Sequence, residues 1–106
     1  AVGRLMAREM ARPTPALNAL ATRAVQPVFD ELSALVQAVA GNTLSPSRLR
    51  LHSTSVIGQC LVYRFGEAML ARLNPPHFGQ DDAALIADHV CDITITSLLH
   101  AAKVQV

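Results

Sequence analysis

Charged residues are scarce in this chain. They make up 16% of its 106 residues, and nine Lys and Arg residues are nearly balanced by eight acidic ones. The basic residues are scattered, and a formal net charge of +1 cannot neutralise a row of DNA phosphates. The sequence therefore predicts no strong DNA-binding surface within these residues.

Long apolar runs and paired cysteines are also missing. No stretch approaches the roughly 18 uninterrupted apolar residues of a membrane span. Arg4, Arg8 and Arg12 leave no room near the start for the apolar segment of a signal peptide. Cys60 and Cys91 lie in separate apolar helical patterns rather than in a C-x-x-C motif, which is typical of reduced, buried thiols, and a single disulfide is the alternative. We therefore expect a cytoplasmic protein without a membrane segment.

Strand patterns are almost absent. The one alternating run, residues 93–96, lies inside an apolar helical period that extends on both sides, so we expect it to be helical. The chain has neither an internal repeat nor a low-complexity tract. A chain of this length buries one modest core, and we expect a single all-α domain over residues 1–106.

Proline positions divide the first half of the chain. A helix is expected over residues 1–12, after which Thr14 and Pro15 have the residue types of an N-cap and of a first helical position. The apolar period then continues over residues 16–39. Proline lacks an N–H donor and clashes with the carbonyl group four residues earlier, so we expect a kink or brief break just before Pro27.

Two long helices are expected in the second half. Gly41-Asn42 suits a left-handed C-cap, and Ser45-Pro46 suits the start of a helix. The following residues 47–73 contain no proline and predict a helix of roughly 27 residues. The last helix is expected over residues 81–104, because its first two residues are aspartates, and the helix dipole favours negative charge in the first turn.

Both long helices are apolar on more than one face. Hydrophobic residues make up 51% of the chain, which is more than one small interior needs. In the last helix Ile86, Val90 and Ile93 form one apolar face, and further apolar residues lie on another. Gly58 and Gly66 interrupt the preceding helix, and such glycines are typical of close helix packing. The pattern predicts a symmetric four-helix interface between two copies, and its alternative is a monomeric bundle with both helices central.

Several segments resemble one known family. These are residues 7–10 (AREM) with 13–17 (PTPAL), the Gln26-Pro27 break, and residues 55–63 (SVIGQCLVY). Together they resemble the C-terminal domain of TetR-family transcription regulators, in particular the CecR-like subfamily. The resemblance covers nearly the whole chain, although its motifs are apolar and helical rather than catalytic.

The resemblance implies a fold and a division of labour. In that family an N-terminal helix-turn-helix headpiece reads an operator, while the C-terminal domain binds a small effector and dimerises through its last two long helices. It therefore implies an all-α bundle of about four to five helices, the last two forming a dimeric four-helix bundle. DNA binding would then belong to a headpiece that this chain lacks.

An apolar pocket with a few polar groups is the expected effector site, and the effector is expected to be a small apolar or aromatic molecule. Gln59 is the most informative candidate, because an amide within an apolar helix needs a ligand, a partner subunit or backbone carbonyls as hydrogen-bond partners. Tyr63 lies one turn further on the same side. The full candidate set, whose other members are also ordinary core residues, is Met6, Met10, Phe29, Leu32, Gln59 and Tyr63.

Contacts between subunits are expected along both long helices. The candidates are small or apolar residues that follow the helical period: Val56, Gly58, Val62, Gly66, Ile86, Val90, Ile93 and Ser97.

Catalytic and metal sites are not indicated. His89 and Asp92 have a helical spacing that can share a metal, but no ligand motif on a second helix completes the site. Cys60 with a histidine is the one conceivable nucleophile and base, and no pattern supplies an oxyanion stabiliser. We expect no enzyme activity, cofactor or metal. A sensing and dimerisation domain is the first hypothesis, and a helical interaction or scaffold domain without a small-molecule site is the alternative.

Overall fold

The computed structural model describes residues 2–104, and the regular elements in this range are all helices. The predicted all-α fold is thus confirmed. In chain order the elements are α1 (Val2–Ala11), α2 (Ala16–Leu20), the π-helical segment η1 (Ala21–Val25), α3 (Gln26–Val39), α4 (Pro46–Phe65), α5 (Glu67–Leu70), the 3₁₀ segment η2 (Gln80–Asp82) and α6 (Ala83–Val104).

A buried carboxylate forms the corner between α1 and α2. The backbone N–H of Thr14 donates to Oε2 of Glu9 at 2.8 Å, and the Thr14 hydroxyl donates to Oε1 at 2.6 Å. The same hydroxyl accepts a hydrogen bond from the N–H of Ala16, the first residue of α2, at 3.2 Å. These hydrogen bonds hold the pKa of Glu9 below its ordinary value of 4.5. The bond from the Thr14 hydroxyl contributes most, and the bond from the Thr14 N–H contributes next. The polar residues of this corner therefore fix the direction in which α1 leaves the domain.

The predicted break before Pro27 is a π-helical turn. Residues 21–25 adopt π geometry between α2 and α3, and the N–H of Gln26 donates to the carbonyl of Ala21, five residues earlier. The wider turn accommodates a proline ring that an α-helix would press against the preceding turn. The chain thus continues as one bent helical arm from Ala16 to Val39.

The main core lies where α3, α4 and α6 meet at one end of the molecule. Gly41 and Asn42 have φ values of 66° and 59°, so the predicted left-handed C-cap is confirmed. Ser45 accepts a hydrogen bond from the N–H of Arg48 at 3.3 Å and caps α4, also as predicted. These turns bring together four buried apolar side chains, Val36, Ala40, Leu44 and Leu98.

The predicted helix over residues 47–73 is wrong at its C-terminal part. α4 ends at Phe65, because Gly66 leaves the α-helical conformation with φ −90° and ψ 4°. A Cβ atom at Gly66 would lie 2.5 Å from the Val62 carbonyl oxygen, so a larger residue at this position would force the backbone to shift. Only the short α5 follows before the loop. Gly66 therefore ends α4 instead of taking part in the close helix packing that we expected of it.

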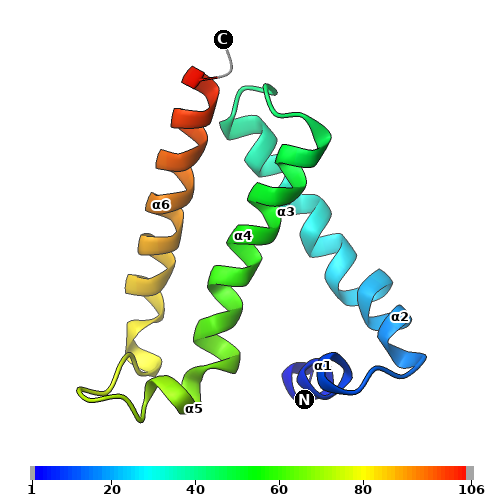
Figure 1. The fold of residues 1–106 in the computed structure, drawn as a ribbon, viewed down its shortest axis with the longest axis vertical. Coiled ribbons are helices and arrows are strands. Elements are labelled where there is room, and N and C mark those ends of the chain that lie inside the picture. Colours follow the sequence, from blue (N-terminus) through cyan, green and yellow to red (C-terminus); the bar gives the residue numbers. More distant parts are fainter. Residues whose placement is uncertain (1, 105–106) are drawn as a thin grey trace.

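The molecule is open and flat rather than spherical. Its principal extents are 43 × 40 × 18 Å, and Figure 1 shows the α2–α3 arm diverging from α4, with α1 at the foot of the gap and α6 antiparallel to α4. Its radius of gyration is 15.9 Å, whereas a compact domain of about 100 residues has roughly 13 Å. The accessible surface is 7891 Å² against roughly 5,700 Å² expected of a compact monomer of this mass.

Both cysteines lie on the surface. Cys60 and Cys91 are free and exposed, so the expectation of buried thiols is wrong for the chain by itself. The prediction that each cysteine lies in a helix is confirmed. The helix faces that carry the two cysteines are not covered by other parts of the open fold.

Candidate functional site

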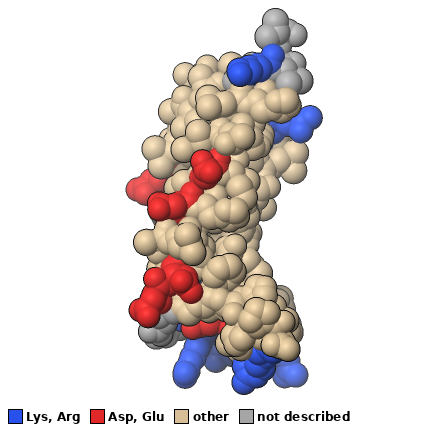
Figure 2. Space-filling model, turned by 90° about the vertical axis from the view of Figure 1, so that its left-hand side faces the viewer, with Lys and Arg blue, Asp and Glu red and all other residues tan. Residues whose placement is uncertain are grey.

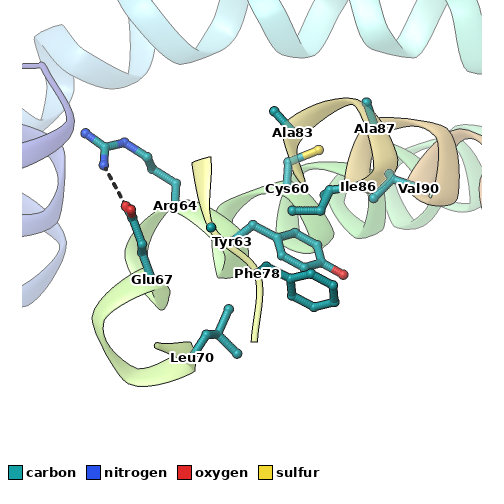
Figure 3. Close-up of a pocket in the computed structure, with 11 residues that line it drawn as sticks. Cys60, Tyr63, Arg64, Glu67, Leu70, Phe78, Ala83, Ile86, Ala87 and Val90 are labelled. Atoms are coloured by element: carbon teal, nitrogen blue, oxygen red, sulfur yellow. Dashed lines mark ion pairs between the residues drawn. The ribbon is translucent and has the colours of Figure 1, made fainter. Parts of the chain in front are cut away.

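A cavity of about 460 Å³ lies at the end of the molecule away from the main core. Four segments line it: α4, α5, the loop before α6, and α6 itself (Figure 3). We call it the tyrosine pocket. Its lining is mainly apolar and consists of Cys60, Tyr63, Arg64, Glu67, Leu70, Phe78, Gly79, Ala83, Ile86, Ala87 and Val90.

Aromatic and small side chains divide the tyrosine pocket into two sides. The rings of Tyr63 and Phe78 meet edge to face, with centroids 5.8 Å apart and planes at 76°. Ala83 and Ala87, one turn apart on α6, belong to the other part of the lining. The two alanines leave the space that longer side chains on this face of α6 would occupy.

The charged residues at the tyrosine pocket neutralise each other. Nη1 of Arg64 lies 3.5 Å from Oε2 of Glu67, one turn further along the chain. Figure 3 shows the Arg64 side chain extending away from Tyr63 and Phe78. Its guanidinium reaches α1 at Gly3, where a Cβ atom would lie 3.4 Å from Nη2. Arg64 therefore connects the pocket end of α4 with α1.

A second, smaller cavity of about 200 Å³ lies between α4 and α6, nearer the main core. We call it the seam groove. It joins residues predicted for subunit contacts, namely Val56, Ile93 and Ser97, to the predicted ligand residue Gln59. The hydroxyl of Thr94, which also lines the groove, is buried without a hydrogen-bond partner among the described residues.

An exposed stripe runs along α4 beside the seam groove. Its members recur at alternating spacings of four and three residues, which is the spacing of a helix that packs against another helix. All of them are exposed, and the space around Gly58 is open for a Cβ atom. The stripe consists of Leu51, Ser55, Gly58, Val62 and Phe65.

The six predicted ligand residues do not share one cavity. Tyr63 alone among them lines the tyrosine pocket, and Gln59 lines the seam groove. Leu32 packs against the main core, and Met10 is exposed. The other two, Met6 and Phe29, are half-buried on α1 and α3.

The eight predicted interface residues are also divided. Val56, Ile93 and Ser97 line the seam groove, and Gly58 and Val62 lie on the exposed stripe. Ile86 and Val90 instead line the tyrosine pocket, and Val90 is buried within its own chain. Gly66, the remaining one, ends α4.

Three residues of the tyrosine pocket were not predicted from the sequence, namely Phe78, Ala83 and Ala87. Phe78 lies in an irregular loop, where no periodicity indicates the direction of a side chain. The two alanines could have been found as small residues at a spacing of four, which places them on one face of α6.

Charge is sparse around α6. Figure 2, which views the molecule from that side, shows a mostly uncharged face with acidic groups in its lower and middle parts and basic groups near its two ends. Within residues 2–104 no helix is long and apolar enough to cross a membrane. The described side chains include no group of three or more His, Cys, Asp or Glu arranged to hold a metal ion.

The helical architecture and a family comparison together define the class of protein. The chain matches the C-terminal domain of the HTH-type transcriptional dual regulator CecR over residues 1–101. It therefore belongs to this family of regulator C-terminal domains, and the predicted TetR-type, CecR-like resemblance is confirmed.

One curated relative shows how similar this chain is to a known regulator. The chain is 28% identical over 96 residues to the HTH-type transcriptional dual regulator CecR of Shigella flexneri. The match includes 89% of this chain and 43% of the relative, so the chain spans less than half of that protein's length. No solved structure matches the chain.

Proposed function

We propose that this chain is the effector-sensing and homodimerisation domain of a TetR-type transcription regulator. In this proposal a small apolar or aromatic effector binds the domain, and DNA is bound through a separate helix-turn-helix domain. The domain itself performs no catalysis and needs no cofactor. The family supports the regulatory role, and the open architecture supports the need for a partner.

The observation that carries the proposal is the excess of accessible surface. The chain exposes roughly 2,200 Å² more than a compact monomer of its mass. A standard protein interface buries only about 800 Å² on each partner, so the excess is sufficient for one subunit interface and for further covering elements. Within this surface, the exposed stripe on α4 has the residue spacing of a helix-packing face. The seam groove lies directly beside it.

The two helices α4 and α6 fit a symmetric interface. They lie side by side and antiparallel (Figure 1). A two-fold axis next to this pair would bring four helices together. At the stripe, Gly58 and Ser55 permit close approach, and Leu51, Val62 and Phe65 provide apolar contact. The Thr94 hydroxyl, which has no hydrogen-bond partner among the described residues, lies in the groove beside them. So does the Gln59 amide, whose Nε2 donates to the Ser55 carbonyl at 3.3 Å.

The alternative hypothesis, a scaffold domain with a filled core and no small-molecule site, predicts a chain without a substantial cavity. The tyrosine pocket, at about 460 Å³, is within the usual size range of small-molecule sites. The mainly apolar lining of this pocket and its aromatic pair, rather than its volume, support a sensing domain over a scaffold.

Two matched valine variants test the interface. Val62 on α4 is 51% exposed, and Val28 on α3 is 59% exposed but lies outside the stripe. In Val62→Arg a charge enters an apolar interface, so we expect the dimer dissociation constant to rise at least about tenfold, or 1.4 kcal/mol. Val28→Arg is expected to leave it unchanged. Sedimentation velocity over a range of concentrations measures both, and equal constants for the two variants would contradict the proposed interface.

A further inference from the structure

The chemistry of the tyrosine pocket selects against charged ligands. The paired side chains of Arg64 and Glu67 neutralise each other, and Arg64 extends toward α1 rather than into the cavity (Figure 3). The remaining lining offers carbon surface, one thiol and one phenol. Transfer of an unpaired charge from water into such surroundings is costly, whereas transfer of an apolar ring is favourable.

The shape of the pocket suits a flat ligand. Phe78 and Tyr63 present the edge of one ring to the face of the other, so a third ring can join by stacking or by another edge-to-face contact. Ala83 and Ala87 leave space on the α6 side for a planar group. The Tyr63 hydroxyl makes no hydrogen bond with any described residue, and one ligand polar group can therefore bond to it.

We infer that the tyrosine pocket binds an uncharged aromatic molecule, whose rings contact Phe78, Tyr63 and the two alanines and whose single polar group bonds to the Tyr63 hydroxyl. This inference rests on the proposed sensing function and specifies the site and the chemistry of its ligand. It places the effector between α4, α5 and α6, away from the sequence-predicted residues Met10, Phe29 and Leu32.

The position of Arg64 supplies a route from this pocket to α1. Arg64 follows Tyr63 directly in α4, and its guanidinium lies against Gly3 of α1. α1 is in turn fixed to α2 by the bonds between Glu9 and Thr14. A ligand that moves Tyr63 therefore acts on the end of α4 that contacts α1.

N-phenyl-1-naphthylamine, an uncharged aromatic dye that brightens in apolar surroundings, is a suitable probe. Tyr63 is the one tyrosine of the chain, and the chain has no tryptophan. The tyrosine emission therefore reports on this pocket alone. Addition of the dye to the complete chain is expected to increase dye emission and to quench Tyr63 emission in parallel.

Two alanine variants on α6 distinguish dye binding in the tyrosine pocket from nonspecific binding to apolar surface. Ala87→Leu fills the pocket and is expected to weaken dye binding at least about tenfold. Ala84→Leu adds the same side chain at an exposed position outside the pocket lining and is expected to leave binding unchanged. Circular dichroism of both variants verifies that α6 remains folded.

The Tyr63 hydroxyl is tested with a pair of competitors. Tyr63→Phe is expected to weaken the binding of 2-naphthol about five- to tenfold, which is the effect of one hydrogen bond. The affinity for naphthalene, which has no hydroxyl group, is expected to stay unchanged. Displacement of the dye measures both affinities. 1-Naphthoic acid is expected to compete less well than 2-naphthol, and stronger competition by the acid would overturn the assignment of an uncharged ligand.

The outcomes distinguish this inference from the proposed function. If Phe29→Ala abolishes dye binding and Ala87→Leu does not, the effector site is the one predicted from the sequence, and the tyrosine pocket is rejected while the sensing function stands. If the dye binds the chain at no site and no aromatic compound raises its unfolding temperature, the sensing function itself fails. Binding that Ala84→Leu weakens as much as Ala87→Leu would also reject the pocket.

Discussion

Glu9 shows how one buried carboxylate can fix the direction of a helix. Its hydrogen bonds from Thr14 lower its pKa below the ordinary 4.5. A group whose pKa is lower in the folded than in the unfolded chain stabilises the fold above the ordinary pKa, and this stabilisation is lost as the pH falls through the lowered value. The α1–α2 corner is therefore expected to weaken under acidic conditions.

Glu9→Gln tests this corner. The amide carries no charge, so the variant is expected to unfold at a lower temperature than the parent at pH 7, with the difference shrinking as the pH falls well below 4.5. Glu31→Gln, at an exposed position on α3, is the control. Circular dichroism melts between pH 3 and 7 measure the effect, and a constant difference across this range would contradict the assigned role of the carboxylate.

At the scale of elements, the helix boundaries were predictable where a local signal determines them. The bend before Pro27, the left-handed cap at Gly41 and the start of α4 after Ser45 all follow from residue types that act on their own backbone. The end of α4 at Gly66 was missed, because a glycine in an apolar helical pattern is compatible with either a helix interior or a helix end. The choice depends on how the following loop packs.

Pro27 offers a direct test of the bend. Pro27→Ala restores an N–H donor and removes the ring, so the π-helical segment is expected to convert to α-helix, with a gain of up to about 3 kcal/mol. The control is Pro15→Ala, because Pro15 precedes α2 at a position where no intrahelical donor is lost. Urea titration followed by circular dichroism compares them. An equal or larger gain from Pro15→Ala would show that Pro27 does not strain the arm.

At the scale of the whole molecule, the sequence predicted that apolar surface would remain uncovered but not where all of it would lie. The pattern placed Val90 at a subunit interface, whereas the fold buries it beside the tyrosine pocket. It placed Cys91 inside the molecule, whereas the open fold exposes it. Helical periodicity identifies which residues share a face, but the neighbour that covers each face is decided by tertiary packing. The pocket itself depends on Phe78, a loop residue without a periodic signal.

The central proposal at this level is that the chain is half of a dimer. Its surface excess, the stripe on α4 and the groove between α4 and α6 support this proposal. Sedimentation equilibrium of the unmodified chain at micromolar concentration tests this most directly. The predicted result is a species of twice the 11.3 kDa chain mass. A folded monomer of 11.3 kDa at every concentration would contradict the assigned interface.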